Sequence, residues 1–234
     1  DNPAIGPGSP RRRFPDLLRL AADAYRVELG KHTSFFRLVA SRFLILLGIA
    51  SVTPFAQLYV KEMIGAPDPA QSAGLLTSAM AAGALLGMYP SGRLADRFGR
   101  KPLIYAGGVI AASALFLFNF VGGLRSLLIF GAIAGLGYGM FVPAGWAMLV
   151  DLTPGDEPGR FLGLANIAGA GALILGPALA GPVLKPLNSL RPALGYDFLF
   201  TLIPAFILAG LAVLRTVKIG SARQPDPQAD HESE

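Results

Sequence analysis

The sequence predicts an all-α membrane protein whose chain crosses a bilayer six times. Hydrophobic residues make up 53% of the 234 residues, and charged residues only 15%, whereas soluble domains carry about 25% charged residues. Charges are also clustered, so that none lies between Asp68 and Arg93 or between Lys101 and Arg125. Each of these stretches is long enough for a helix to cross a hydrocarbon layer of about 30 Å.

Six such apolar stretches are the predicted membrane spans. They cover residues 36–60, 72–92, 102–122, 126–150, 160–183 and 196–214. Their lengths suit transmembrane helices once interfacial residues are included. Glycine recurs every fourth residue at Gly131, Gly135 and Gly139, which predicts close packing of the fourth span against a neighbour. Because six is an even number, both ends of the chain are expected on the same side.

The chain outside the spans is predicted to be linker and tail. Residues 1–13 are rich in Pro and Gly and end in three arginines, which indicates a disordered linker. Residues 14–31 place apolar side chains at helical spacing between charged ones, as in an amphipathic helix on the cytoplasmic membrane surface. Residues 33–218 are then the six-helix transmembrane domain. The polar residues 219–234 are expected to be a disordered cytoplasmic tail.

Charge asymmetry predicts that both termini are cytoplasmic in a cell membrane. In the loops of the opposite side, the cations are Lys61, Arg125, Lys185 and Arg191; nearly all of the others lie toward the termini or in the two remaining loops. Short loops rich in Lys and Arg stay in the cytoplasm. The net charge of +5 is therefore interpreted as orienting the chain in the bilayer, and no nucleic-acid partner is predicted.

The polar stretch between the second and third spans carries a family resemblance. Its sequence at 92–101, Gly-Arg-Leu-Ala-Asp-Arg-Phe-Gly-Arg-Lys, resembles the motif that joins the second and third helices of a half in major facilitator superfamily transporters. Membrane topology alone explains the cations, but not Gly92, Asp96 and Gly99 at their spacing. The whole stretch 92–102 is expected to be a tight loop.

The resemblance implies a fold and a place for this chain in a larger transporter. The fold is one half-bundle of six helices, built from two inverted three-helix repeats. A complete transporter of this family has twelve helices, so half of it is expected to be missing here. The opening of the chain resembles the central cytoplasmic loop of the family, which favours the C-terminal half and an N-terminal half as its partner.

The resemblance also implies a gate at the cytoplasmic face. Arg97 or Arg100 is expected to pair with Asp151, with Asp96 stabilising the turn. Such a cluster would lock the outward-facing state and break on inward opening; the alternative is a static ion pair that sets topology. The predicted gate residues are Gly92, Asp96, Arg97, Gly99, Arg100, Lys101, Asp151 and Arg160.

Uncharged polar side chains within the spans are the candidates for solute contact, because no carboxylate lies at the middle of a span. The resemblance implies that the first and fourth helices line the central cavity, so Gln57 and Tyr138 are the leading candidates for contact with the solute. The predicted pathway residues are Ser51, Thr53, Gln57, Asn119, Tyr138 and Asn166. A competing interpretation is that such residues only hydrogen-bond neighbouring helices.

The remaining predictions within the spans concern four residues expected to bend helices, one arginine and one tryptophan. Helix bends are expected at Pro54, Pro143, Gly176 and Pro177. Arg42 lies near a span end and is expected to extend its guanidinium group to the inner membrane surface. Trp146 is expected to lie in the aromatic belt at that surface.

The sequence also excludes several functions. The absence of Cys excludes disulfides and thiolate metal sites, and the residues form no catalytic constellation, so no enzyme, metal or cofactor is expected. The predicted function is secondary active transport of a small solute by alternating access, with the bilayer, the solute and the missing half as partners. The alternatives are a half-transporter that works as a homodimer, with a second copy as partner, and a non-transporting scaffold or receptor.

Overall fold

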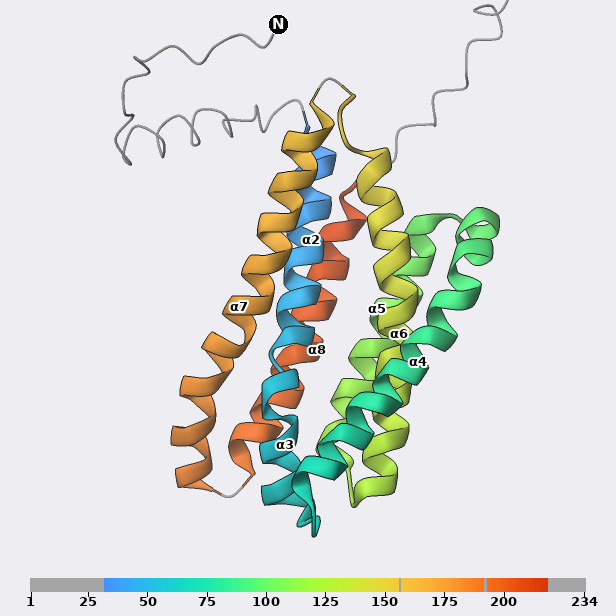
Figure 1. Cartoon of the computed structure of the whole chain (residues 1–234). Helices are drawn as coiled ribbons and strands as arrows, with labels where there is room; N and C mark the ends of the chain where they lie inside the picture. Colours follow the sequence, from blue (N-terminus) through green and yellow to red (C-terminus); the bar gives the residue numbers. More distant parts are fainter. Residues whose placement is uncertain (1–31, 156, 192, 219–234) are drawn as a thin grey trace, which may run out of the picture.

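The computed structural model describes residues 32–155, 157–191 and 193–218, and their regular elements are all helices. The six long helices are α2 (Thr33–Ala50), α4 (Pro69–Phe98), α5 (Arg100–Phe116), α6 (Leu124–Asp151), α7 (Pro158–Leu190) and α8 (Leu194–Arg215) (Figure 1). Each is long and apolar enough to span a membrane, α5 together with the 3-10 turn that follows it. The predicted class is therefore confirmed. The linker, amphipathic helix and tail expected at 1–13, 14–31 and 219–234 lie outside the described residues.

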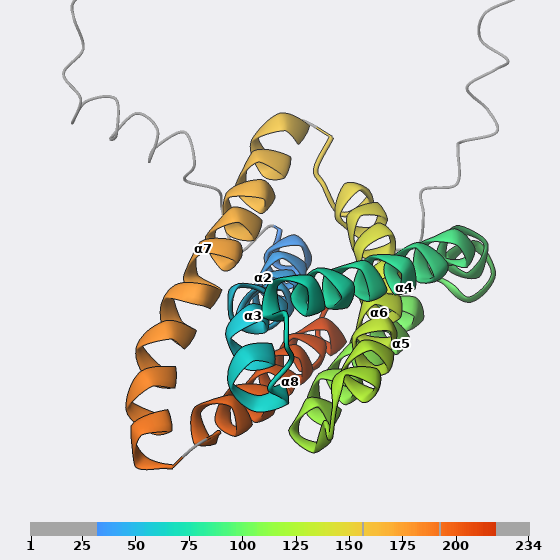
Figure 2. The same cartoon turned by 60° about the horizontal axis from the view of Figure 1, so that its bottom comes forward.

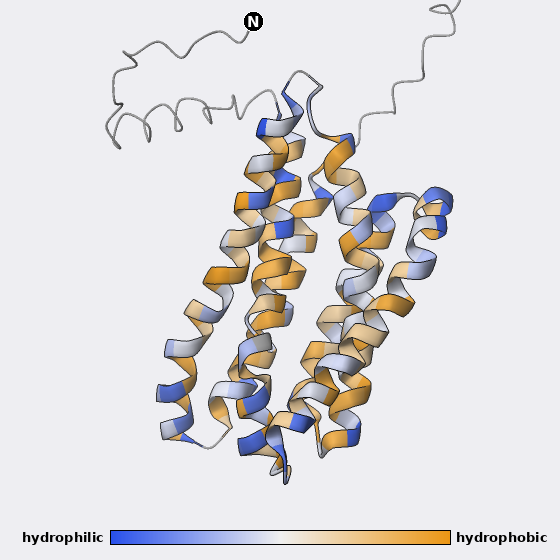
Figure 3. Ribbon diagram, in the orientation of Figure 1, coloured by the Kyte–Doolittle hydropathy of each residue, from blue (hydrophilic) through white to orange (hydrophobic). Residues whose placement is uncertain are grey.

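The helices run alternately in opposite directions, so their connections gather at two ends of the bundle (Figure 1). We call them the Gly99 end, which carries the α4–α5 and α6–α7 connections, and the Gly65 end, which carries the other three. The start of α2 and the end of α8 both lie at the Gly99 end. Polar residues gather toward the two ends, and apolar residues cover most of the middle (Figure 3). This distribution suits a bundle whose middle lies in lipid.

The helices pack as two groups of three that correspond to each other. α2 packs against α7 and α8, while α6 packs against α4 and α5; contacts between α5 and α8 join the groups (Figure 2). Exchanging α2, α4 and α5 for α6, α7 and α8, in that order, maps these contacts onto themselves. The bundle therefore consists of two three-helix repeats, α2–α4–α5 and α6–α7–α8, as the sequence predicted from its resemblance. Each packed group combines helices of both repeats.

Glycines allow α4 and α6 to approach each other closely. A Cβ atom at Gly83 of α4 would lie 1.9 Å from the backbone oxygen of Ala132, and one at Gly139 of α6 would lie 2.0 Å from that of Ala84. Backbone atoms cannot move aside without displacing a whole helix, so the contact requires residues without a side chain. The glycine stripe predicted for packing in the fourth span thus faces α4.

The first predicted span is not one helix. α2 ends at Ala50, and Ser51 and Val52 form a turn. The chain then continues through η1 (Thr53–Phe55, a 3-10 turn), α3 (Ala56–Tyr59) and η2 (Val60–Ile64, a π-helix). Pro54 lies inside η1, where its missing N–H and its ring interrupt the α-helical bonding. The break agrees with the bend expected at Pro54.

The motif stretch 92–102 is mostly helical, so the expectation of a tight loop was wrong. α4 continues to Phe98 and α5 begins at Arg100, which leaves Gly99 as the single residue between them. Gly99 has φ 87°, in the region that favours glycine. From the sequence, the polar residues are interpreted as a loop because they follow the apolar stretch. They belong instead to the ends of α4 and α5, which extend beyond the apolar residues. α7 likewise continues to Leu190, past the predicted end at residue 183.

Candidate functional site

The main polar contact at the Gly99 end joins α5 to α6. Because Gly99 reverses the chain within one residue, Arg100 begins α5 beside the last turn of α6. Its Nη1 donates to the backbone oxygen of Ala147 at 2.6 Å and to the carboxylate of Asp151. The side chains of the pair are 37% and 51% exposed. Of the two arginines expected to reach Asp151, the structure selects Arg100, and its cation also suits the negative end of the α6 dipole.

Lys101 binds the end of α8. Its Nζ donates to the backbone oxygens of Val217 at 2.8 Å and Arg215 at 3.2 Å. The last carbonyl groups of a helix lack partners within it and attract cations. Arg37 of α2 acts in the same way, since its Nη1 donates to the backbone oxygen of Thr216 at 2.9 Å. The motif therefore connects the start of α5 to the ends of both α6 and α8.

Replacing Lys101 with alanine is expected to loosen the end of α8. Two hydrogen bonds from a charged donor at a partly exposed site contribute about 1 kcal/mol together, so amide hydrogen exchange in the last turn should accelerate roughly fivefold. Exchange followed by mass spectrometry in detergent measures this change. Lys101→Arg is the matched control and should keep the protection. An unchanged rate in the alanine variant would show that Arg37 holds this end alone.

The remaining residues of the predicted gate do not converge on Asp151. Arg97 lies over the ring of Phe98, with 5.3 Å between its guanidinium carbon and the ring centroid. Asp96 is exposed and forms no hydrogen bond or ion pair with the described part of the chain, so its expected role in stabilising the turn finds no contact to act through. A side chain at Gly92 would meet nothing within 4 Å.

Arg160, also predicted for the gate, takes a different partner. Its Nη1 donates to the carboxylate of Glu157 at 2.6 Å, within the first turn of α7. This pair connects residues three apart on one helix start and joins no two helices. Position in the α6–α7 connection therefore did not place Arg160 beside Asp151.

The predicted pathway residues do not form one polar cluster. Ser51 is buried and its hydroxyl donates to the backbone oxygen of Leu47 at 2.7 Å, so it is satisfied within its own helix turn. Asn119 lies in the 3-10 turn Leu117–Phe120 (η3) near the Gly65 end, and its Nδ2 donates to the backbone oxygen of Phe116 at 2.9 Å. No hydrogen bond among the described residues joins two members of the predicted set.

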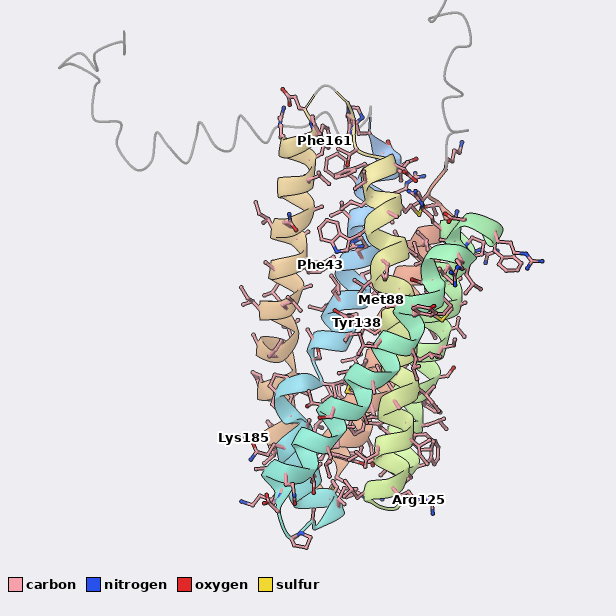
Figure 4. All side chains as sticks on the ribbon, turned by 45° about the vertical axis from the view of Figure 1, so that its right-hand side comes forward. Phe43, Met88, Arg125, Tyr138, Phe161 and Lys185 are labelled. Atoms are coloured by element: carbon pink, nitrogen blue, oxygen red, sulfur yellow. The ribbon has the colours of Figure 1, made fainter. Side chains whose placement is uncertain are left out.

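The other pathway candidates are open to their surroundings. Gln57 of α3 and Asn166 of α7 are exposed. Tyr138, midway along α6, is 36% exposed (Figure 4). Thr53 lies in η1, and its side chain is not described. Gln57, Asn166 and Tyr138 share one property: their exposed amide or phenol groups can form hydrogen bonds with another molecule.

The residues predicted to bend helices have different surroundings. Pro143 lies inside α6 and Pro177 inside α7, and both helices continue through them. Gly176 provides close contact between α7 and α2, because a Cβ atom there would lie 2.8 Å from the backbone oxygen of Leu47. Of the four predicted bends, only Pro54 therefore coincides with a change in helix type within the described residues.

Arg42 is the residue that the sequence interpretation misplaced. Its side chain does not extend to the membrane surface but turns into the bundle, where it is only 8% exposed. The guanidinium carbon lies 4.8 Å from the ring centroid of Trp146 and 5.8 Å from that of Phe141, both on α6. Trp146 is thus a partner of Arg42 and not simply a residue of an interfacial belt. Packing against two aromatic rings competes with extension into water.

The environment of Arg42 leaves part of its charge uncompensated. Inserting an Arg in the middle of a spanning helix costs about 2.5–3.5 kcal/mol, and a desolvated contact with an aromatic face returns about 2 kcal/mol. Its Nη1 is buried without a hydrogen-bond partner among the described residues. A sequence signal for this site existed: Arg42 is the tenth residue of α2, and α2 contains no acid.

Comparisons with known proteins agree with this architecture. The sequence model described as Major Facilitator Superfamily matches residues 38–233. The quinolone resistance protein NorA of Staphylococcus aureus is 29% identical over 146 residues, which are 62% of this chain and 37% of NorA. The multi-drug resistance efflux pump PmrA homolog of Lactococcus lactis subsp. lactis is 28% identical over 169 residues, 72% of this chain and 42% of that protein.

A solved structure shows the same fold. The xylose transporter XylE from E. coli, in an inward open conformation, matches with a TM-score of 0.62 and 20% identity over 78% of this chain and 48% of XylE. The matched part of the chain thus covers less than half of each of these three proteins.

Proposed function

The chain belongs to the Major Facilitator Superfamily, and on this premise we propose that it is half of a transporter that carries a small solute across a membrane by alternating access. The observation that carries the proposal is the combination of a family match over 38–233 with matched segments that cover less than half of each relative. Six helices in two corresponding groups of three are what one half of such a transporter contains. A second bundle of six helices would complete the solute pathway.

The apolar surfaces of α4 and α7 support this arrangement. These two helices correspond to each other under the exchange of repeats, and both leave large apolar side chains uncovered. On α4, Leu85 and Leu86 are 69% exposed, and on α7, Ile174 is 70% exposed. We propose that the missing N-terminal half covers these faces; a second copy of the chain is the alternative occupant. Lipid contact would suit the same side chains, so the oligomeric state of the complete protein tests this part.

The Arg100–Asp151 pair is the proposed gate element. It joins the start of α5 to the end of α6 at the end of the bundle where the chain enters α2 and leaves α8. A contact between two helix ends can break when the helices tilt apart, whereas a contact within one helix start cannot. We therefore assign the gate to this pair and leave Arg160 as a local stabiliser of α7.

Flux through the complete protein in liposomes tests the proposed function. The relatives named for quinolone resistance and multi-drug efflux make export of drug-like organic compounds the first class to examine. Saturable flux of at least one solute is the expected result. Binding without flux across a broad panel would favour the receptor or scaffold alternative. Purification of functional protein containing only two copies of this chain would favour the homodimer.

The proposed orientation places the Gly99 end and both termini in the cytoplasm, and it can be tested with single cysteines because the chain has none of its own. A cysteine at Gly92 is expected to react with a membrane-impermeant maleimide only after the cells are opened. A cysteine at Gly122, at the opposite end of the bundle, should react in intact cells. Side chains at both positions enter open space. The reverse labelling pattern would invert the proposed topology.

A further inference from the structure

The buried guanidinium group of Arg42 lies in a site that the proposed gate does not use. Arg42 projects from α2 into the seam between α2 and α6, where Phe141, Gly145 and Trp146 surround its end. The other arginine of this helix, Arg37, is exposed and bound to the end of α8. No carboxylate of the described residues pairs with Arg42. Asp151, the one acid of α6, is bound to Arg100.

Aromatic rings satisfy the faces of this guanidinium group but not its edge. A ring attracts a cation that lies above its plane, whereas the N–H groups of Arg point outward in the guanidinium plane and need acceptors there. Nη1 has no such acceptor among the described residues and is shielded from solvent. The group that fits two N–H donors on one edge is a planar anion, such as a carboxylate, which binds Arg through paired hydrogen bonds.

Gly145 allows Nη1 to pack directly against the backbone of α6. A Cβ atom at this position would lie 2.6 Å from Nη1, closer than any real contact, so a residue with a side chain would displace the guanidinium group. Tyr138 and Trp146 lie on one face of α6, two turns apart, and are 36% and 38% exposed. An aromatic and partly open surface therefore lies next to a buried cation that lacks an anion.

We propose that Arg42, together with Trp146 and Tyr138, binds the carboxylate of an aromatic anionic solute. This inference rests on the proposed transport function and adds the substrate class to it. The carboxylate accepts from the edge of Arg42, and the ring of the solute packs against the exposed parts of the two aromatic side chains. Because Trp146 covers the guanidinium group, movement of the indole ring accompanies entry of the anion.

Trp146 makes the site directly observable, because it is the one tryptophan of the chain. Benzoate added to the purified 234-residue chain in a non-ionic detergent is expected to change its fluorescence saturably. Benzamide, which is neutral and of the same shape, should not. Arg42→Gln should raise the apparent Kd for benzoate by about tenfold or more, as expected for a lost charge-assisted contact. Arg37→Gln is the matched control on the same helix and should bind as the unchanged chain does.

Two substitutions at Gly145 provide a second test that does not depend on correct folding of Arg42→Gln. Gly145→Asp introduces a carboxylate beside Nη1, and the flexible end of Arg42 can shift to accommodate it. We expect this variant to lose benzoate binding and to melt at a higher temperature than Gly145→Asn, which has the same size but no charge. A folded chain without a saturable benzoate response, or equal binding by the Arg42→Gln variant, would overturn the inference.

The carboxylate could come from the solute or from a side chain of the other six-helix half. Calorimetric titration of the complete protein with benzoate separates these sources. Retained binding that depends on Arg42 supports the solute. Binding seen in the isolated chain but lost in the complete protein would show that an internal carboxylate occupies the site and would overturn the substrate assignment. Flux that is independent of Arg42 would also overturn it while leaving the transport function intact.

Discussion

Replacing Asp151 with asparagine is expected to lower solute flux through the complete transporter about fivefold while leaving its thermal stability nearly unchanged. The ion pair with Arg100 is about half exposed, and such pairs contribute about 1 kcal/mol or less to the free energy of unfolding. In alternating access the same free energy acts on a balance between two conformations. If the pair forms in only one of them, about 1 kcal/mol changes their ratio roughly fivefold.

A double-mutant cycle separates a gate from a static contact. Arg100→Gln should lower flux at least as much as Asp151→Asn, because it also removes the hydrogen bond to the backbone oxygen of Ala147. The double variant should lower flux no further than Arg100→Gln, because the ion pair is already broken. Glu157→Gln is the matched control, since it breaks an ion pair at the same end of the bundle but within the first turn of α7. Flux measured in liposomes should be retained in this control. If the Glu157→Gln control loses as much flux as the variants of Arg100 and Asp151, the Arg100–Asp151 pair is a static contact that sets topology and not a gate.

Replacing Gly83 with alanine is expected to destabilise the bundle by about 1–3 kcal/mol, the range for overpacking a tight interior. The added methyl group would lie 1.9 Å from the backbone oxygen of Ala132, so α4 and α6 must move apart. Separation of the helices also affects the contacts at Gly135 and Gly139, where a Cβ atom would lie 2.0 Å from α4. Thermal unfolding followed by circular dichroism in one detergent measures the loss.

Gly74 provides the matched control on the same helix. A Cβ atom there would meet nothing within 4 Å, so Gly74→Ala should leave the melting temperature unchanged or raise it slightly, because alanine favours a helix over glycine by about 0.5–1 kcal/mol. Similar melting temperatures for the two variants would mean that α4 and α6 lie further apart than the structure places them.

The candidate site was only partly predictable, and Arg100 and Arg42 show why. The motif placed several cations near the end of the second span and Asp151 near the end of the fourth, so a pair between them followed from helix order. Which arginine pairs with Asp151 depends on the direction in which α5 starts, and Gly99 sets that direction with a positive φ. Asp96 carried the same motif signal but lies on the exposed side of α4.

The position of the Arg42 side chain could not be read from its place in the sequence. A long cationic side chain in a spanning helix can extend toward water or fold inward. The choice depends on the neighbouring helix, which here offers two aromatic rings and direct contact with its backbone at Gly145. Residues 42 and 145 are far apart in the chain, and nothing in the periodicity of either helix brings them together.

The sequence by itself determined that the described part of this protein is helical, that six of its helices are long and apolar enough to span a membrane, and that it resembles the transporters of its family. These properties depend on the lengths of apolar stretches, which the thickness of the bilayer sets, and on a motif of consecutive residues. Only the tertiary structure decided which helix types follow the break in the first span, which arginine reaches Asp151 and what surrounds Arg42. Helical periodicity places a side chain on one face of its own helix, but packing between helices decides what that face meets.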